Sequence, residues 1–330
     1  MSVARAMAGT ARSAALAAAL AAGCAGATQA AVLRSADTHP DGYPTVEAVK
    51  RMGALLREET GGRVSIVVHH SRQLGEERDT IEQAVTGVLD MTRVNLAPFN
   101  SMVKETLVPA LPFLFRSADH MRRTMDGEIG EQILRAFLPH GLVGLAFYDS
   151  GARSFYNAAR PIRTPRDMAG LRLRVQQSDL FVALVNALGA SATPMAYGEV
   201  LSGIQAGIID GAENNWPSYR SSQHHRAARY YSLTEHSLSP EVLVMSKRSW
   251  DRLSTGDQIA VRRAAKRSVP YMRGLWDTAE YEARRAVEAE GAVVNEVDKT
   301  PFVAAMKPVY DRLVTDPLLK SLVERVQAVR

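Results

Sequence analysis

Apolar positions in this chain repeat with two different periods, and the two periods alternate from one end to the other. Within residues 44–62 they stand three or four residues apart, at Val46, Val49, Met52, Leu55 and Leu56. That spacing predicts a helix, which the pair Gly61 and Gly62 should end. The next residues, RVSIVVHH, are mostly β-branched and apolar, which is typical of a strand.

The same alternation continues through the rest of the chain. Strands are predicted at 31–36, 91–95, 141–149, 171–176, 208–214, 228–236 and 242–247. Helices are predicted at 76–90, 164–170, 178–189, 196–207 and from Trp250 to about Glu290, with an interruption at Pro270. Strands that alternate with helices, several of them apolar throughout, predict an α/β fold with largely parallel sheets.

Polar clusters stand at the ends of six predicted strands, in both halves of the chain: DTHPDGY, HHSRQLGEERD, TRVN, YDSGARS, RVQQSD and DGAENN. In parallel sheets, ligands bind beyond the carboxyl ends of the strands. A chain of 330 residues with 46% hydrophobic residues can also build more than one core. We therefore expect two lobes with one shared cleft between them.

The first thirty residues have a composition of their own. They carry two arginines, no acidic residue, the apolar run SAALAAALAAG and then small residues. This layout predicts a secretory signal peptide over residues 1–30, with a disordered alanine-rich tail as the alternative. Cys24 is the only cysteine, so a mature chain would lack disulfides and thiolate metal sites. A lipid anchor at Cys24 stays open as a second fate of this segment.

Charge and motif content argue against two function classes. The net charge is +5, but basic and acidic residues are interspersed, so we expect no nucleic-acid partner. The chain has no glycine-rich phosphate loop, no G-x-S-x-G and no H-E-x-x-H, so we expect neither catalysis nor a cofactor. The adjacent pairs His69–His70 and His224–His225 are expected to be solvated histidines rather than metal ligands.

Arginines at strand ends are the strongest candidates for chemistry. Arg172 and Arg174 share one face of a predicted strand, and Arg153 stands at the end of another. Arg93 and Asn95 share a face of a third strand. A buried arginine is costly unless it meets an anion, and its planar fork fits a carboxylate. Internal salt bridges are the structural alternative, but several donors at strand ends favour a site for an organic acid.

Long segments of the chain resemble the substrate-binding proteins of tripartite ATP-independent periplasmic (TRAP) transporters, which include the DctP-type dicarboxylate binders. They are LGEERDTIEQAVTGVLDMTRV, LPFLF, GARSFYN, PIRTPRDMAGLRLRV, LGASATPMAYGEVLSGIQAGIIDGAENN and TEHSLSPEVLVMSK, in family order. The resemblance implies a two-lobed periplasmic binding protein (type II-like) with mixed sheets, a long helix crossing both lobes, and no catalysis. It also implies delivery of an organic acid to membrane permease subunits. We expect residues 31–149 with about 240–279 in one lobe, and 150–239 with about 280–330 in the other.

The resemblance also implies site residues. The family's carboxylate-clamping arginine falls on Arg174 and its second arginine on Arg153, whereas Arg172 receives no role. The other implied ligand contacts fall on Asn214, Glu77, Asn95 and Tyr197. Asn95 stands where the sialic-acid binders have an acid, which argues against sialic acid as the ligand.

HPDGYPTVEAV, FYDSGARSFYN and DGAENNWPSY resemble the branch that binds hexuronates such as D-glucuronate and D-galacturonate. Further contacts expected on that basis are His39, Arg93, Asn215 and Trp216. Packing under its own loop is an equal alternative for Trp216, and Asp210 and Glu213 are expected to be structural. An aldonate, a keto-sugar acid or a dicarboxylate remains an alternative ligand. A secreted sugar-acid enzyme with Glu77 as base, or a sensor module, remains an alternative function. We expect a monomer.

Overall fold

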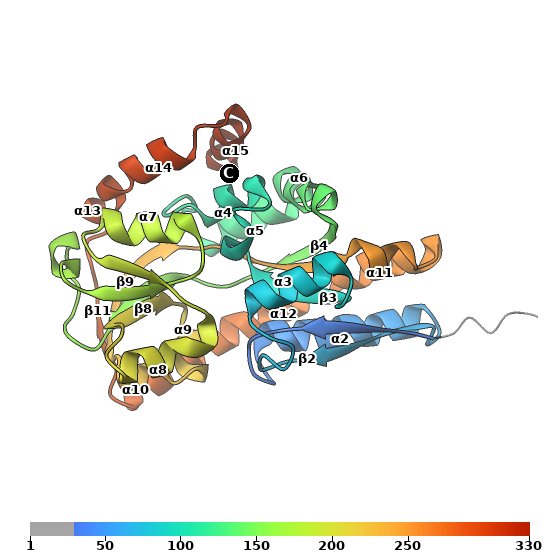
Figure 1. Cartoon of the computed structure of the whole chain (residues 1–330), viewed down its shortest axis with the longest axis horizontal. Helices are drawn as coiled ribbons and strands as arrows, with labels where there is room; N and C mark the ends of the chain where they lie inside the picture. The colour runs from blue at the N-terminus through green and yellow to red at the C-terminus, as the bar shows by residue number, and fades with distance from the viewer. Residues whose placement is uncertain (1–29) are drawn as a thin grey trace, which may run out of the picture.

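The computed structural model describes residues 30–330 and contains two mixed sheets joined by a long helix (Figure 1). The predicted signal peptide and Cys24 lie outside the described residues. We name the two sheets sheet A and sheet B. The predicted α/β architecture with two lobes is confirmed. No helix in the described part of the chain is long and apolar enough to cross a membrane.

Sheet A has five strands in the order β2-β1-β3-β10-β4. Their bounds are β1 Ala31–Ala36, β2 Val64–His69, β3 Met91–Asn95, β4 Leu142–Tyr148 and β10 Glu241–Ser246. β1 runs parallel to β2 and β3, whereas β10 is antiparallel to both β3 and β4. The start of β10 therefore lies at the same edge as the ends of β1 and β3.

Sheet B has six strands in the order β11-β9-β5-β8-β6-β7. Their bounds are β5 Arg153–Asn157, β6 Arg172–Val175, β7 Ser191–Pro194, β8 Gly211–Asn214, β9 Tyr230–Ser237 and β11 Val293–Asn295. β6 is parallel to β7 and β8, and β5 is antiparallel to β8 and β9. The start of β5 thus meets the ends of β6 and β8 at one edge, facing sheet A's corresponding edge.

Helices flank both sheets (Figure 1). Those that precede β5 in the chain are α2 Pro44–Glu59, α3 Glu77–Thr86, α4 Leu107–Ala110, α5 Ala118–Asp126 and α6 Glu128–Ala136. Those that follow β5 up to β9 are α7 Asp179–Ala187, α8 Val200–Gln205, α9 Trp216–Ser221 and α10 His224–Ala227. The predicted helix at 164–170 is only a 3₁₀ turn at Pro165–Met168, because the left-handed Gly170 (φ +78°) turns the chain into β6.

The helix α12, Thr255–Ala289, follows α11 Lys247–Asp251 and joins two of the cores. Its N-terminal part packs Val261 against α2 in the core of sheet A, and its C-terminal part packs Val287 in a core of sheet B. The interruption predicted at Pro270 is wrong, because α12 is continuous over 35 residues. Pro270 and Lys266 lie on the exposed face, where water can bond the carbonyl that the proline leaves unbonded.

The last helices tie the two halves together. They are α13 Thr300–Ala305, α14 Lys307–Leu313 and α15 Pro317–Ala328. α14 packs on α7, whereas α15 packs on α4 and α6 of the sheet A side. A single core cluster accordingly runs from Phe99 through Leu173 to Phe302 and Leu322. The exact lobe boundaries stay a prediction, and α15 is placed against the opposite side from the one we expected.

Candidate functional site

A small cavity lies between the facing edges of the two sheets. Its lining is almost wholly polar and comes from both sides: Thr38, His39, Glu77, Asn95, Arg153, Arg174, Gln176, Tyr197, Asn214, Ser218 and Glu241. Most of these residues stand at strand ends or just after them, and those from the antiparallel strands β5 and β10 stand at strand starts. The mixed topology therefore brings both kinds of strand terminus to one place, as expected for a shared cleft.

Three arginines are almost fully buried, and two of them are paired with carboxylates. Arg93 donates from Nε to Asp37 at 2.8 Å and from Nη1 to Glu241 Oε2 at 2.5 Å. Arg153 donates from Nε and Nη2 to the two oxygens of Glu213, at 2.5 and 2.8 Å. These pairs satisfy the guanidinium groups inside the protein. Arg93 stands behind Asp37 and Glu241 and does not line the cavity.

Arg174 is the third buried arginine, and it has no such partner. It is 3% exposed, and within the described residues its one side-chain hydrogen bond runs from Nε to the carbonyl of Met195 at 2.9 Å. Within residues 30–330, no carboxylate oxygen lies within 4.0 Å of its guanidinium. Burial, aided by the charge of Arg153, accordingly lowers the pKa of Arg174 despite the more distant Glu213. An anion entering the cavity would offset this cost.

Arg172 shows why only one arginine of the predicted pair serves this site. Its side chain is 47% exposed and pairs with Asp210 at 2.7 Å on the outside of sheet B. Glu213 holds Arg153, and despite its burial the charge of Arg153, together with the nearby His236, lowers its pKa to about 2. The structural roles expected for Asp210 and Glu213 are thus confirmed.

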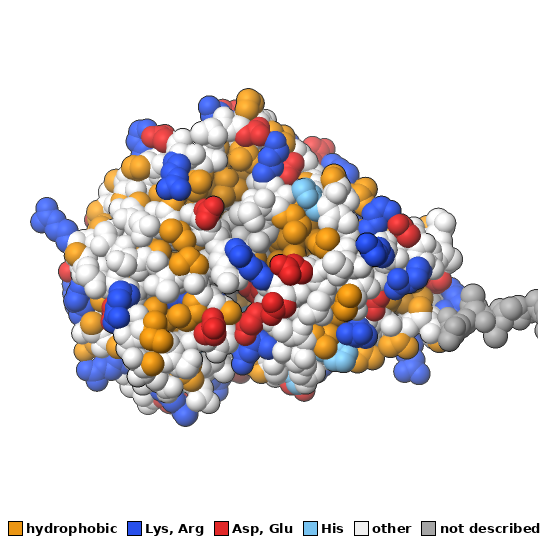
Figure 2. All heavy atoms as spheres, in the orientation of Figure 1, with side chains coloured by type: hydrophobic (Ala, Val, Ile, Leu, Met, Phe, Trp, Pro, Cys, Tyr) orange, Lys and Arg blue, Asp and Glu red, His pale blue; other side chains and the backbone are white. Residues whose placement is uncertain are grey.

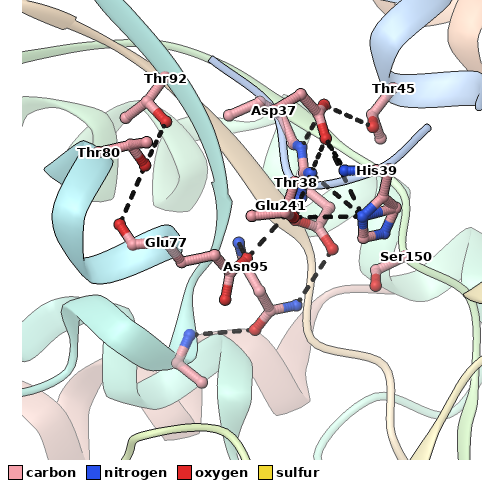
Figure 3. Close-up of polar contacts among 12 residues, drawn as sticks. Asp37, Thr38, His39, Thr45, Glu77, Thr80, Thr92, Asn95, Ser150 and Glu241 are labelled. Carbon is pink, nitrogen blue, oxygen red and sulfur yellow. Dashed lines mark hydrogen bonds and ion pairs between the residues drawn. The ribbon is translucent and has the colours of Figure 1, made fainter. Parts of the chain in front are cut away.

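An acidic corner forms the sheet A wall of the cavity (Figure 3). Glu77 from α3, Asn95 from β3 and Glu241 from β10 converge there. Asn95 donates its backbone N–H to Glu77 at 3.3 Å and its Nδ2 to Glu241 at 3.4 Å, and its Oδ1 accepts from Ala97 at 3.1 Å. Burial and the charge of Glu241 raise the pKa of Glu77 to about 7, against the opposing charge of Arg93.

His39 and Tyr197 form an aromatic contact between the two sides. Their rings stack with centroids 5.3 Å apart, and Tyr43 packs edge-on against His39 at 3.9 Å. His39 Nε2 lies 3.3 Å from Ser218 Oγ, whose other neighbour is Tyr43 Oη at 2.9 Å. Burial and the charge of Arg93 hold the pKa of His39 well below its ordinary value, so the ring is neutral.

Two amides on the sheet B wall keep free hydrogen-bonding groups. Asn214 uses its Oδ1 to accept from Arg153 at 2.9 Å, and its Nδ2 has no partner among the described residues. Gln176 is 6% exposed, and its Oε1 is buried without any partner in the same part of the chain. We did not predict Gln176. It stands two residues after Arg174, so the strand period of two would have placed it on the same face.

Besides Arg93, the structure places two more predicted contacts, Asn215 and Trp216, outside the cavity lining. Asn215 caps α9 by accepting the N–H of Ser218 at 2.8 Å, and donates to Ser150 at 3.3 Å. Trp216 stacks on Tyr231 with centroids 3.8 Å apart and borders a separate, larger hollow near Trp276. Both belong to the turn that starts α9, which carries their side chains away from Asn214.

The expectation of solvated histidines is wrong for one pair. His224 and His225 are buried, with His224 Nδ1 2.6 Å from Tyr156 Oη and His225 Nε2 2.9 Å from Glu290. A short helix, α10, turns both rings toward the protein. Among the residues that the structure describes, no cluster of three or more His, Cys, Asp or Glu side chains could hold a metal ion.

Direct hydrogen bonds join the two sides around the rim of the cavity. Glu76 Oε1 accepts the backbone N–H of Gly198 at 3.2 Å, and Arg78 donates to the carbonyl of Gln177 at 3.1 Å. Ser178 donates to Asn100 Oδ1 at 2.8 Å. On the face seen in Figure 2, acidic side chains gather about the middle, between the two halves. The cavity is therefore enclosed by contacts between segments far apart in the sequence.

A family model described as "Bacterial extracellular solute-binding protein, family 7" (DctP) matches residues 35–316. A solute-binding protein of Chromohalobacter salexigens is 44% identical over 301 residues, which cover 91% of this chain and 90% of the relative.

Solved structures agree with the described fold. A TRAP periplasmic solute-binding protein from Bradyrhizobium sp. BTAi1, in complex with α/β-D-galacturonate, is 55% identical with a TM-score of 0.89. The match covers 89% of this chain and 99% of that one. One from Roseobacter denitrificans, with bound β-D-glucuronate, is 42% identical with a TM-score of 0.88, covering 91% and 100%.

Proposed function

This chain belongs to family 7 of the bacterial extracellular solute-binding proteins, and we propose that it captures a hexuronate, D-glucuronate or D-galacturonate, for a TRAP transporter. The observation that carries the proposal is Arg174, a buried guanidinium without a carboxylate partner on the wall of a polar cavity. Similar proteins of known structure hold these two sugar acids.

The cavity offers what a sugar acid needs. The Arg174 fork can take the carboxylate through two parallel hydrogen bonds, which a lysine cannot do. Hydroxyls then have donors and acceptors in Asn214, Glu77 and Asn95 along the walls. Charge-assisted hydrogen bonds contribute roughly 1.5–3 kcal/mol each, so the carboxylate contact should dominate the affinity. Micromolar binding needs about −8 kcal/mol, which this contact and several hydroxyl bonds can supply together.

The roles of Arg153, Arg93 and His39 follow from their partners. Arg153 lines the cavity, but Glu213 already neutralises it, so we assign it a weaker contact with the ligand. Arg93 fixes Asp37 and Glu241 and supports the wall from behind. His39 and Tyr197 enclose the ligand as an aromatic contact.

Location and partners complete the proposal. The leader composition of residues 1–30 and the family support export to the periplasm, where the protein would hand its ligand to the TRAP membrane permease subunits. We propose that the protein acts as a monomer and binds its ligand without converting it. Product analysis after long incubation with either uronate would reveal turnover if Glu77 acted as a base.

Calorimetric titration of residues 31–330, freed of bound ligand, tests the proposal. D-glucuronate and D-galacturonate are the ligands, and succinate and sialic acid are the controls. We expect micromolar or tighter binding of at least one uronate and no saturable binding of the controls. If succinate bound tightly and neither uronate produced heat, the ligand would be a dicarboxylate rather than a hexuronate.

A further inference from the structure

Gln176 is a buried polar side chain of the cavity wall that the proposed function has not used. It is 6% exposed, its Oε1 has no partner in the described part of the chain, and it lines the same cavity as Arg174. A buried amide that makes no hydrogen bond costs on the order of 1–3 kcal/mol. A water, an ion or a ligand can satisfy such a group, and the place of Gln176 on the cavity wall makes it a candidate for ligand recognition.

The strand register fixes where Gln176 stands. β6 is parallel to β8 with Arg174 level with Ala212, so Gln176 stands level with Asn214 when the register is continued. Residues two apart on a strand lie about 6–7 Å apart on the same face. The free Oε1 of Gln176 and the free Nδ2 of Asn214 thus lie one step beyond the Arg174 fork. Because Asn214 Oδ1 is held by Arg153, its amide offers a donor only.

The structure of a hexuronate ring determines which of its atoms can bind Gln176 Oε1 and Asn214 Nδ2. The carboxylate is attached to C5, and the ring neighbours of C5 are the ring oxygen and C4. The ring oxygen has no hydrogen, so it can accept from the Nε2 amide of Gln176 but cannot donate to its Oε1. The C4 hydroxyl can donate to Gln176 Oε1 and accept from Asn214 Nδ2, which satisfies all three groups.

We propose that Gln176 reads the C4 hydroxyl of the sugar acid, next to the carboxylate that Arg174 holds. C4 is the one centre at which D-glucuronate and D-galacturonate differ. Gln176 is therefore a specificity-determining residue for these two epimers. The inference rests on the proposed function, because it requires a hexuronate in the cavity.

A double-mutant cycle between protein and ligand tests the inference. Residues 31–330 as wild type, Gln176→Met and Gln177→Met are titrated with D-glucuronate, D-galacturonate and 4-deoxy-hexuronate, which lacks the hydroxyl in question. Gln177 is the matched control, since it neighbours Gln176 but does not line the cavity. Thermal melts of the ligand-free proteins verify folding, and Gln176→Met should melt no lower than the wild type because it removes an unbonded buried amide.

We expect Gln176→Met to weaken binding of the preferred uronate about tenfold and to leave 4-deoxy-hexuronate binding unchanged. The variant should also bring the affinities for the two epimers closer together, and Gln177→Met should match the wild type. The inference would be wrong if Gln176→Met lost as much affinity for the 4-deoxy sugar as for the uronates, or lost no affinity at all. The proposed function would still stand in that case, provided that the wild type binds a uronate. If the wild type bound neither uronate, both the inference and the proposed function would be wrong.

Discussion

The two walls of the cavity differ in how well they are satisfied without a ligand. On the sheet A wall, Asn95 bonds Glu77 and Glu241, and Glu241 bonds Arg93, so nearly every polar group has a protein partner. On the sheet B wall, Arg174 is buried without a carboxylate partner, and Gln176 Oε1 is buried without any hydrogen-bond partner among the described residues. The sheet A wall is a preorganised surface, and the sheet B wall holds the groups that gain most from a ligand.

The paired and unpaired arginines of sheet B extend this contrast to stability. Arg153 carries its own counter-ion in Glu213, whereas Arg174 has none in the described residues. The Arg153–Glu213 pair should stabilise the fold. Arg174 should destabilise the ligand-free protein and should strengthen ligand binding.

The largest effect is expected from Glu213→Gln. It leaves Arg153 buried with an uncompensated charge, which costs about 3–5 kcal/mol in the free energy of unfolding. Because the pKa of Glu213 is lowered to about 2, its contribution is present above its unfolded-state pKa and is lost as the pH falls towards 2. Urea unfolding of both proteins at pH 7 and pH 3 measures this. A difference that stayed the same at both pH values would count against the pair as its source.

Arg174→Lys should come next, with a loss of at least about a hundredfold in uronate affinity. Lysine keeps the charge but cannot form the two parallel bonds of the guanidinium. Arg172→Lys is the matched control, because its side chain faces solvent and pairs with Asp210. Calorimetry on the three proteins gives the comparison, and equal losses in the two variants would remove Arg174 from its special position.

Glu77→Gln tests the acidic corner, with an expected effect on the order of 3 kcal/mol in the free energy of unfolding. Burial raises the pKa of Glu77 to about 7. Between pH 4.5 and pH 7 the folded protein therefore keeps a proton on Glu77 that the unfolded chain, with its ordinary pKa of 4.5, has already released. The free energy of unfolding of the wild type should therefore decrease as the pH rises from 4.5 to about 7. The Gln variant should not show this decrease. Unfolding curves across this range decide it, and identical slopes in both proteins would contradict the assignment.

The smallest effect is expected at the rim, from Gly198→Ala. A Cβ on Gly198 would lie 2.3 Å from Glu76 Oε1, so Glu76 must move away from its bond to the Gly198 N–H. Uronate affinity should fall a few-fold, about 1 kcal/mol, although neither group lines the cavity. Gly274→Ala, with open space around it, is the control. Unchanged affinity in both variants would show that the rim bond has no part in holding the ligand.

The sequence predicted the architecture and much of the site for physical reasons that can be named. Periodicity found eight of the eleven strands in the described chain and the helices α2, α3, α7, α8 and α12, but it missed β5, β7, β11 and most of the shorter helices. The cost of burying arginine drew attention to Arg174 and Arg153. The sequence alone could not show which arginine pairs with a carboxylate inside the protein. Glu213 and Asp210 are close neighbours in sequence, yet Glu213 pairs with the buried Arg153 and Asp210 with the exposed Arg172. For Trp216 the sequence left stacking on a sugar ring and packing under its own loop open, and the structure shows packing, since the first turn of α9 rotates the ring onto Tyr231.

Pro270 and Gln176 show two further limits. The proline was expected to interrupt α12, but exposure of its face let the helix continue. Gln176 escaped attention because a glutamine at a strand end is ordinary until its burial is known. Both depend on tertiary packing, which a local pattern does not contain.

A crystal structure of residues 31–330 with D-galacturonate would test the central claim most directly. We predict that the sugar carboxylate accepts two hydrogen bonds from the Arg174 guanidinium and lies beside the sheet B wall. A carboxylate bonded instead to Arg153 in place of Glu213, with Arg174 still lacking an anion, would contradict the account.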